Sequence, residues 1–123
     1  MTRLLCLFLS LAAASPSMAA AAAADAAPIR MTIAAGKIGE VCMPLGAGDT
    51  LAWRFRASAP ADFNLHQHVG DKVLTPVSRD SMTRHRARHT VDRDNDWCLT
   101  WTAPATQAIT VSGDWHVRRA RKR

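Results

Sequence analysis

Several catalytic signatures are missing from this 123-residue sequence. It has no Cys-x-x-Cys redox pair and no Gly-x-Ser-x-Gly nucleophile motif, and Glu40 is its single glutamate. Thiol chemistry and serine hydrolysis are therefore without support, and no spacing of aspartates singles out an acid–base pair. A small domain with a filled core also has little room for a deep pocket. We therefore predict a protein that is not an enzyme.

Helical periodicity is scarce as well. Glycine and proline recur at short intervals after residue 24, and no stretch between them carries a 3.6-residue apolar repeat. Alternating patterns are strong instead, and they predict strands over 29–34, 38–43, 50–57, 62–69, 72–77, 96–101 and 108–117, with an ambiguous stretch at 83–91. The sequence thus predicts an all-β antiparallel sandwich or jelly roll of about seven to eight short strands.

Large apolar side chains mark the core of this predicted sandwich. In the segment Asp96–Trp101, two tryptophans and a leucine alternate with smaller residues, as in a half-buried strand. Two upstream strands carry similar alternating apolar faces. The predicted core consists of Trp53, Phe55, Phe63, Leu65, Trp97, Leu99 and Trp101.

The first 24 residues have the layout of a secretory signal peptide. Arg3 precedes the apolar stretch Leu4–Ala14, and Ser17-Met18-Ala19 provides a small-x-small cleavage site. The apolar stretch is too short to span a membrane. We therefore predict three parts, namely a signal peptide (1–24), a β-sandwich domain (25–117) and a basic tail (118–123), and a periplasmic or secreted location.

Two cysteines, Cys42 and Cys98, remain once the signal peptide is removed. An even count in an oxidising compartment favours one disulfide bond. Closing so long a loop would stabilise the fold by roughly 4 kcal/mol on the chain-entropy model. A domain of this size is marginally stable without such a cross-link.

The positive charge is concentrated at the C-terminus in the sequence. The chain has 16 Lys and Arg against 10 Asp and Glu, and five of the positive residues lie in the segment 118–123. Such a tail is typically solvated, although an anionic surface such as lipid could attract it. Interleaved aromatic residues are missing, so we do not expect nucleic acid as a partner.

The order of short motifs resembles the GOLD domain of the p24 cargo-receptor family. The resemblance covers residues 38–117 and rests on Val41-Cys42-Met43-Pro44-Leu45, on the strand 46–55, on Ala61–His66 and on Asp96–Trp101. It implies a sandwich in which Cys42 is bonded to Cys98 and a non-catalytic interaction role. The transmembrane segment and coiled coil of the cargo receptors are missing, so their function is not implied.

His66-Gln67-His68 is the first candidate site. Residues two apart in a strand share a face, so both imidazoles would project together and could bind zinc or copper. Further ligands would have to come from elsewhere in the chain. The alternative is a pair of half-exposed histidines that are hydrogen-bonded to neighbours or water, with no cofactor.

The second candidate is the run Arg84–His89. If the run is extended, its three arginines share one face and could bind carboxylate or phosphate groups. We favour a solvated run balanced by Asp92, Asp94 and Asp96. Those aspartates also resemble the start of a calcium loop, but Trp97 and Ala103 replace its glycine and glutamate, which favours a polar turn.

The sequence therefore favours a small exported binding or accessory module of the cell envelope with an unidentified partner. The alternative is a periplasmic copper- or zinc-binding protein that uses His66 and His68.

Overall fold

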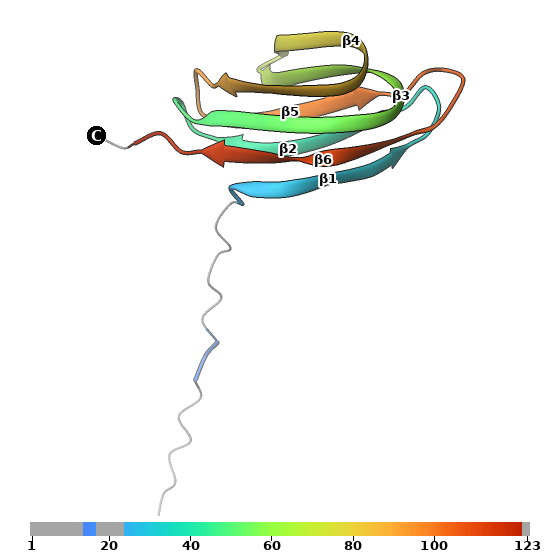
Figure 1. Ribbon diagram of the computed structural model, residues 1–123. Coiled ribbons are helices and arrows are strands. Elements are labelled where there is room, and N and C mark those ends of the chain that lie inside the picture. The colour runs from blue at the N-terminus through green and yellow to red at the C-terminus, as the bar shows by residue number, and fades with distance from the viewer. Residues whose placement is uncertain (1–13, 17–23, 122–123) are drawn as a thin grey trace, which may run out of the picture.

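The computed structural model describes residues 14–16 and 24–121. Its elements are six strands, which Figure 1 shows stacked in one compact body: β1 (Ala26–Ile33), β2 (Ile38–Leu45), β3 (Thr50–Val69), β4 (Lys72–Thr90), β5 (Asn95–Thr102) and β6 (Ile109–Arg118). The predicted signal peptide falls almost wholly outside the described residues. Among the residues described, no helix is long and apolar enough to cross a membrane.

β3 is the strand that organises the sheet. One of its edges pairs with β4, and its other edge pairs first with β6 and then with β5. β1 is added to β6 and β2 to β5, all antiparallel. Because β3 and β4 bend midway, the sheet curls into a half-barrel with two layers (Figure 1). The predicted all-β antiparallel class is confirmed.

The number of strands differs from the seven or eight that the sequence predicts. Residues 57–61 do not end a strand, because Ala57, Ala59 and Ala61 stay buried while Pro60 points outward, so β3 continues through the bend. The small alanines allow the curvature, and the register with β4 shifts there. β4 is creased opposite, at Ser81, whose positive φ is accompanied by an N–H hydrogen bond to Asp62 Oδ1.

The inward faces of the two layers form the core. Each of the seven core side chains predicted from the sequence is at most 3% exposed. Phe55, Phe63 and Trp101 contact one another, with ring centroids 4.9–5.5 Å apart. Aromatic packing of this kind contributes beyond area burial alone, so Trp101 is packed against both halves of the bent strand β3.

The predicted disulfide is present. Cys42 of β2 and Cys98 of β5 are directly opposite each other, with Cα atoms 4.1 Å apart, and the bond encloses both β3 and β4 in its loop. It therefore holds together strands that are 56 residues apart in the sequence.

The start of the predicted basic tail is part of the fold. Arg118 is the last residue of β6, and Arg119 forms ion pairs of 2.9 Å with both Asp25 and Asp49. Burial alone would raise the pKa of Asp49, but hydrogen bonds from the Ala120 and Gly46 N–H groups and from Arg119 outweigh it and lower the pKa. Lys122 and Arg123 lie outside the described residues.

Candidate functional site

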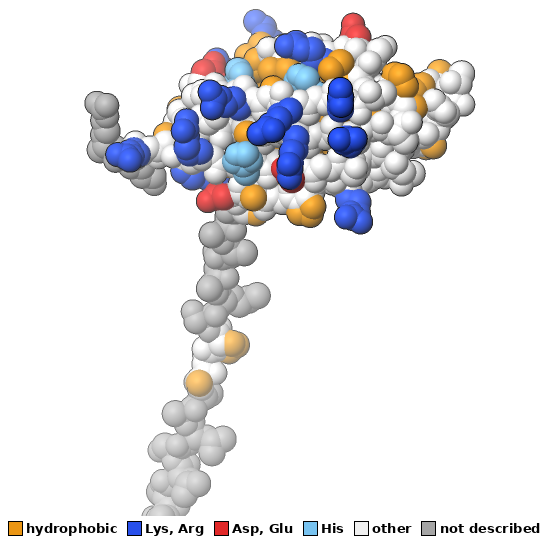
Figure 2. All heavy atoms as spheres, viewed as in Figure 1, with side chains coloured by type: hydrophobic (Ala, Val, Ile, Leu, Met, Phe, Trp, Pro, Cys, Tyr) orange, Lys and Arg blue, Asp and Glu red, His pale blue; other side chains and the backbone are white. Residues whose placement is uncertain are grey.

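The outer surface of one layer carries a group of arginines, here called the arginine face. In the register of β3 and β4, Arg54 lies opposite Arg86 and Arg56 lies opposite Arg84. All members are exposed, and Figure 2 shows basic side chains gathered over this side of the molecule. The arginine face consists of Arg54, Arg56, Arg84, Arg86 and Arg88.

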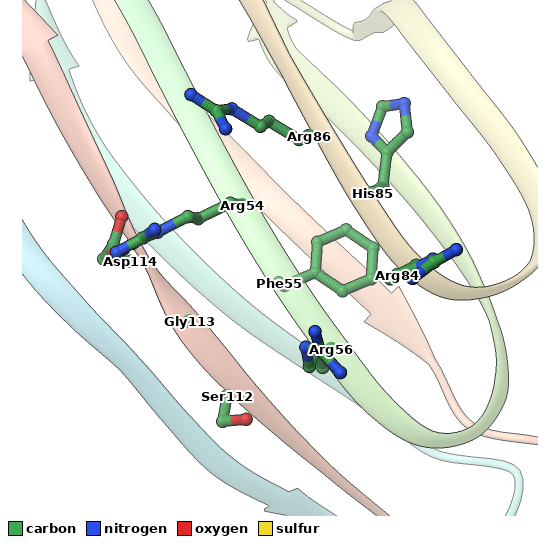
Figure 3. A pocket seen from close by; sticks show the side chains of 9 residues that line it. All are labelled: Arg54, Phe55, Arg56, Arg84, His85, Arg86, Ser112, Gly113 and Asp114. Carbon is green, nitrogen blue, oxygen red and sulfur yellow. Dashed lines mark hydrogen bonds and ion pairs between the residues drawn. The ribbon is translucent and has the colours of Figure 1, made fainter.

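Only one of these five arginines has an acidic partner among the described residues. Arg54 Nη2 lies 2.8 Å from Asp114 Oδ2 on β6, and none of the other ion pairs found there involves a member of the face. Figure 3 shows Asp114 beside Arg54, with Arg86 on the other side. Two adjoining open grooves, of about 610 and 650 Å³, run between these side chains. The face thus offers four guanidinium groups without a carboxylate partner in this part of the chain.

Local sequence places the arginines on one side. In β3 the even-numbered side chains from 52 to 56 point outward while Leu51, Trp53 and Phe55 are buried. β6 approaches β3 so closely here that a Cβ at Gly113 would collide with the backbone of Arg54 and Phe55. Glycine therefore permits the pairing that brings Asp114 to Arg54.

The inner side of β4 is different in character. His85, Ala87 and His89 are half-buried and face the core, as an extended run predicts. His85 Nδ1 accepts a 3.0 Å hydrogen bond from Trp53 Nε1, which requires that nitrogen to be unprotonated. Burial and the charge of Arg79 lower the pKa of His85, so the ring is held neutral.

The three aspartates that follow the arginine run do not balance it. Asp92 pairs with Arg93, Asp94 accepts a hydrogen bond from the Ala47 N–H, and Asp96 lies on β5 in the other layer. The positive and negative charges that follow one another in the sequence are therefore separated in space. The charges of Arg84, Arg86 and Arg88 add to those of Arg54 and Arg56 instead of being cancelled nearby.

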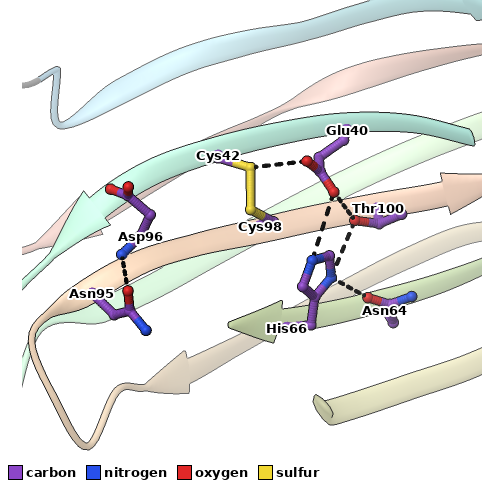
Figure 4. The surroundings of a disulfide bond; sticks show 8 residues. All are labelled: Glu40, Cys42, Asn64, His66, Asn95, Asp96, Cys98 and Thr100. Carbon is purple, nitrogen blue, oxygen red and sulfur yellow. Dashed lines mark hydrogen bonds and ion pairs between the residues drawn. A yellow bond between two sulfur atoms is a disulfide. The ribbon is translucent and has the colours of Figure 1, made fainter. Parts of the chain in front are cut away.

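The outer surface of the second layer carries His66 and His68. Their rings lie 5.2 Å apart between centroids, so the two imidazoles share a face, as predicted. His66 lies beside Cys98 in the sheet and its Nε2 is 3.6 Å from Glu40 Oε2 (Figure 4). Burial lowers the pKa of His66, and the charge of Glu40 opposes that effect only in part.

These groups define what metal binding the second layer could support. Asn64 Oδ1 lies 2.8 Å from His66 Nδ1, so a proton on Nδ1 would leave Nε2 free for an ion shared with Glu40. In the region described, the one cluster of three close donors is Glu40, Cys42 and Cys98, in which both sulfur atoms are committed to the disulfide. A metal held by His66 and His68 stays a prediction.

Sequence reasoning missed three of these residues. Glu40 is 26 positions from His66 in the chain and is brought to it only by the pairing of β2, β5 and β3. Arg54 and Arg56 were visible as the outward side of an alternating strand. Pairing that strand with the run Arg84–His89 as a hairpin would have found the arginine face.

Comparisons with known proteins give fold relatives only. Neither a family model nor a curated protein matches the sequence. One similar solved structure is PliG, a periplasmic inhibitor of g-type lysozyme from Aeromonas hydrophila, with 12% identity, a TM-score of 0.54 and coverage of 77% of this chain and 88% of PliG. Another is the Yersinia pseudotuberculosis-derived mitogen, with 17% identity, a TM-score of 0.51 and coverage of 79% and 89%. At these identities the likeness establishes the fold alone.

Proposed function

We propose that this protein is a small exported, non-catalytic binding module that recognises a negatively charged partner in the cell envelope through the arginine face. The observation that carries the proposal is the set of four exposed guanidinium groups on one face that have no carboxylate partner among residues 14–16 and 24–121. Arginine binds carboxylate and phosphate groups in a bidentate manner and is enriched at binding surfaces.

Repulsion between the arginines of the arginine face favours the binding of an anion. Arg56 lies opposite Arg84, and Arg54 opposite Arg86, and like charges at directly opposite positions destabilise a sheet. An anionic partner would relieve this repulsion and also speed association. The free protein thus carries an electrostatic cost that a ligand removes.

The fold relatives support the non-catalytic role without fixing it. PliG is by name an inhibitor of a lysozyme and is periplasmic, and the second relative is a mitogen. A disulfide-linked chain fits a periplasmic or secreted location. Kinship with the GOLD domain, proposed from the sequence motifs, would imply an interaction role of the same kind.

A capture experiment tests the proposal. Mature protein is immobilised and exposed to envelope extract, in parallel with Arg54→Glu/Arg56→Glu and with the charge-matched control Lys37→Glu/Lys72→Glu, whose side chains are exposed elsewhere. We expect a partner to be retained by the wild type and the lysine control and lost from the arginine variant. Equal retention by all three proteins would refute the role of the face.

The 3.6 Å separation of His66 Nε2 and Glu40 Oε2 favours a second candidate, a copper- or zinc-binding protein. Both atoms could contact one ion, with His68 adjacent. Elemental analysis of untagged protein should then find about one metal ion per chain, lost in His66→Ala/His68→Ala. A metal content that the double variant leaves unchanged would rule this candidate out.

A further inference from the structure

β4 offers an unpaired edge beside the arginine face. In the part of the chain that the structure describes, β4 pairs with β3 alone, so its other edge has no strand next to it. An edge strand presents a row of unpaired N–H and C=O groups, to which an extended peptide can be added. The segment Thr83–Thr90 is a regular part of this edge, because its register with β3 has no shift from Arg84 onward.

The two sides of this edge have opposite chemistry. Arg84, Arg86 and Arg88 point outward, whereas the alternate residues, His85, Ala87 and His89, lie half-buried on the inner side. Beside His89, an open groove of about 450 Å³ is lined in part by Val73, Leu74 and Pro76. Val73 and Leu74 are 55% and 37% exposed, which is unusual for this chain. A strand added here would meet arginine charge on one face, and on the other face two half-buried imidazoles, Ala87 and the apolar side chains of the groove.

From this arrangement we propose that the partner contributes an extended segment of alternating acidic and apolar residues, which adds to β4 as a seventh strand along Thr83–Thr90. The inference deepens the proposed function and rests on it. Side chains on one face of a strand recur every two residues, so carboxylates at alternate positions would align with the three arginines. The apolar side chains between them would cover the inner side and the groove near Val73 and Leu74.

The charge pattern disfavours a second copy as the occupant. Two β4 edges paired antiparallel would place the arginines of both copies on one face, since directly opposite residues share a side. Like charges at such positions are destabilising. An acidic strand has the complementary sign, and that is why the proposal commits to one.

Two peptides of identical composition test the geometry. The blocked peptide EVEVEVE has the required alternation, and its isomer EEEEVVV has the same charge without it. Calorimetry should give at least tenfold tighter binding of the alternating peptide, and hydrogen exchange should show protection of amides within 83–90. N-methylation of alternate amides of the peptide EVEVEVE removes the N–H donors on one of its edges and should abolish binding. Affinities within twofold for the two isomers, or no protection of β4, would overturn the proposal.

Variants separate this inference from the proposed function. Arg84→Glu/Arg86→Glu should weaken the alternating peptide by tenfold or more, and Lys37→Glu/Lys72→Glu should leave its affinity unchanged. The envelope partner could depend on the arginine face while the two isomeric peptides bind with equal affinity. In that case the proposed function stands and strand addition fails. Binding to vesicles of anionic phospholipid without binding to the alternating peptide, or dimerisation through β4 seen by sedimentation, would also overturn strand addition.

Discussion

The polar side chains on the two outer surfaces of this half-barrel differ in how many of them have partners within the protein. Around the disulfide, Glu40 accepts a hydrogen bond from the Thr100 hydroxyl. His66 Nδ1 lies within hydrogen-bond distance of Asn64 and Thr100, and His66 is only 8% exposed. On the arginine face, one ion pair to Asp114 is all that the described residues provide for five exposed guanidinium groups. Groups that satisfy one another hold a fold together, whereas groups left with water alone are available to a ligand.

Removing the disulfide, which lies on the first surface, should have the largest effect on stability. Cys42→Ala/Cys98→Ala opens a loop that spans β3 and β4, and on the chain-entropy model the free energy of unfolding should fall by about 4 kcal/mol. Urea denaturation with and without reductant measures it. A variant as stable as the oxidised wild type would mean that the second layer is held by packing alone.

Reversing charge on the other surface should leave stability nearly unchanged. Arg84→Glu/Arg86→Glu exchanges exposed side chains that form none of the ion pairs found between described residues. The repulsion across β3 and β4 becomes attraction, so the urea midpoint should stay the same or rise slightly while binding of anionic probes drops at least tenfold. A clear loss of stability would show that these arginines are structural.

The histidine under the arginine face predicts a pH effect. The pKa of His85 is lowered in the folded state, so below its ordinary value of 6.5 the unfolded chain takes up a proton that the folded chain does not. Stability should therefore fall as the pH drops below 6.5, and His85→Gln should make this fall shallower. Equal slopes for both proteins between pH 6.5 and 5 would contradict the assignment.

Asp114→Asn should have the smallest effect and sharpens the contrast between the surfaces. The Arg54–Asp114 pair is largely exposed, at 66% and 41% of the two side chains, so its loss should change the free energy of unfolding by about 1 kcal/mol or less. Anion binding should become severalfold tighter, because a fifth guanidinium is freed. Weaker binding would mean that Asp114 positions Arg54 for the ligand.

Short-range sequence patterns predicted the β class, the core residues and the disulfide of this structure well. Alternation at Trp53, Leu65 and Trp101 gave the strands and the core, and the count of cysteines gave the disulfide. The bends were not predicted. Local propensity alone predicts that a strand ends within Ala57–Ala61, whereas tertiary packing keeps the alanines of this segment buried in one continuous strand.

The candidate sites depend on register, and local patterns do not report register. Arg54 becomes significant only beside Arg86, and Glu40 only beside His66, in both cases through strands that pair across many residues. The sidedness of the run Arg84–His89 followed from the two-residue period alone. Kinship with the GOLD domain stays a prediction.

The pairing of β1 with β6 carries a consequence for how the chain comes into being. Among the described residues, 26–33 form their strand pairing with 109–116 alone, and the Val117 N–H also donates a hydrogen bond to the Asp25 carbonyl. Of the six strands described, β1 is synthesised before all the others and β6 after them, so β1 has no pairing partner in nascent chains that end before residue 109. Contacts so distant in sequence slow folding, so we expect the closure of β1 on β6 to be a late step in the folding of this chain.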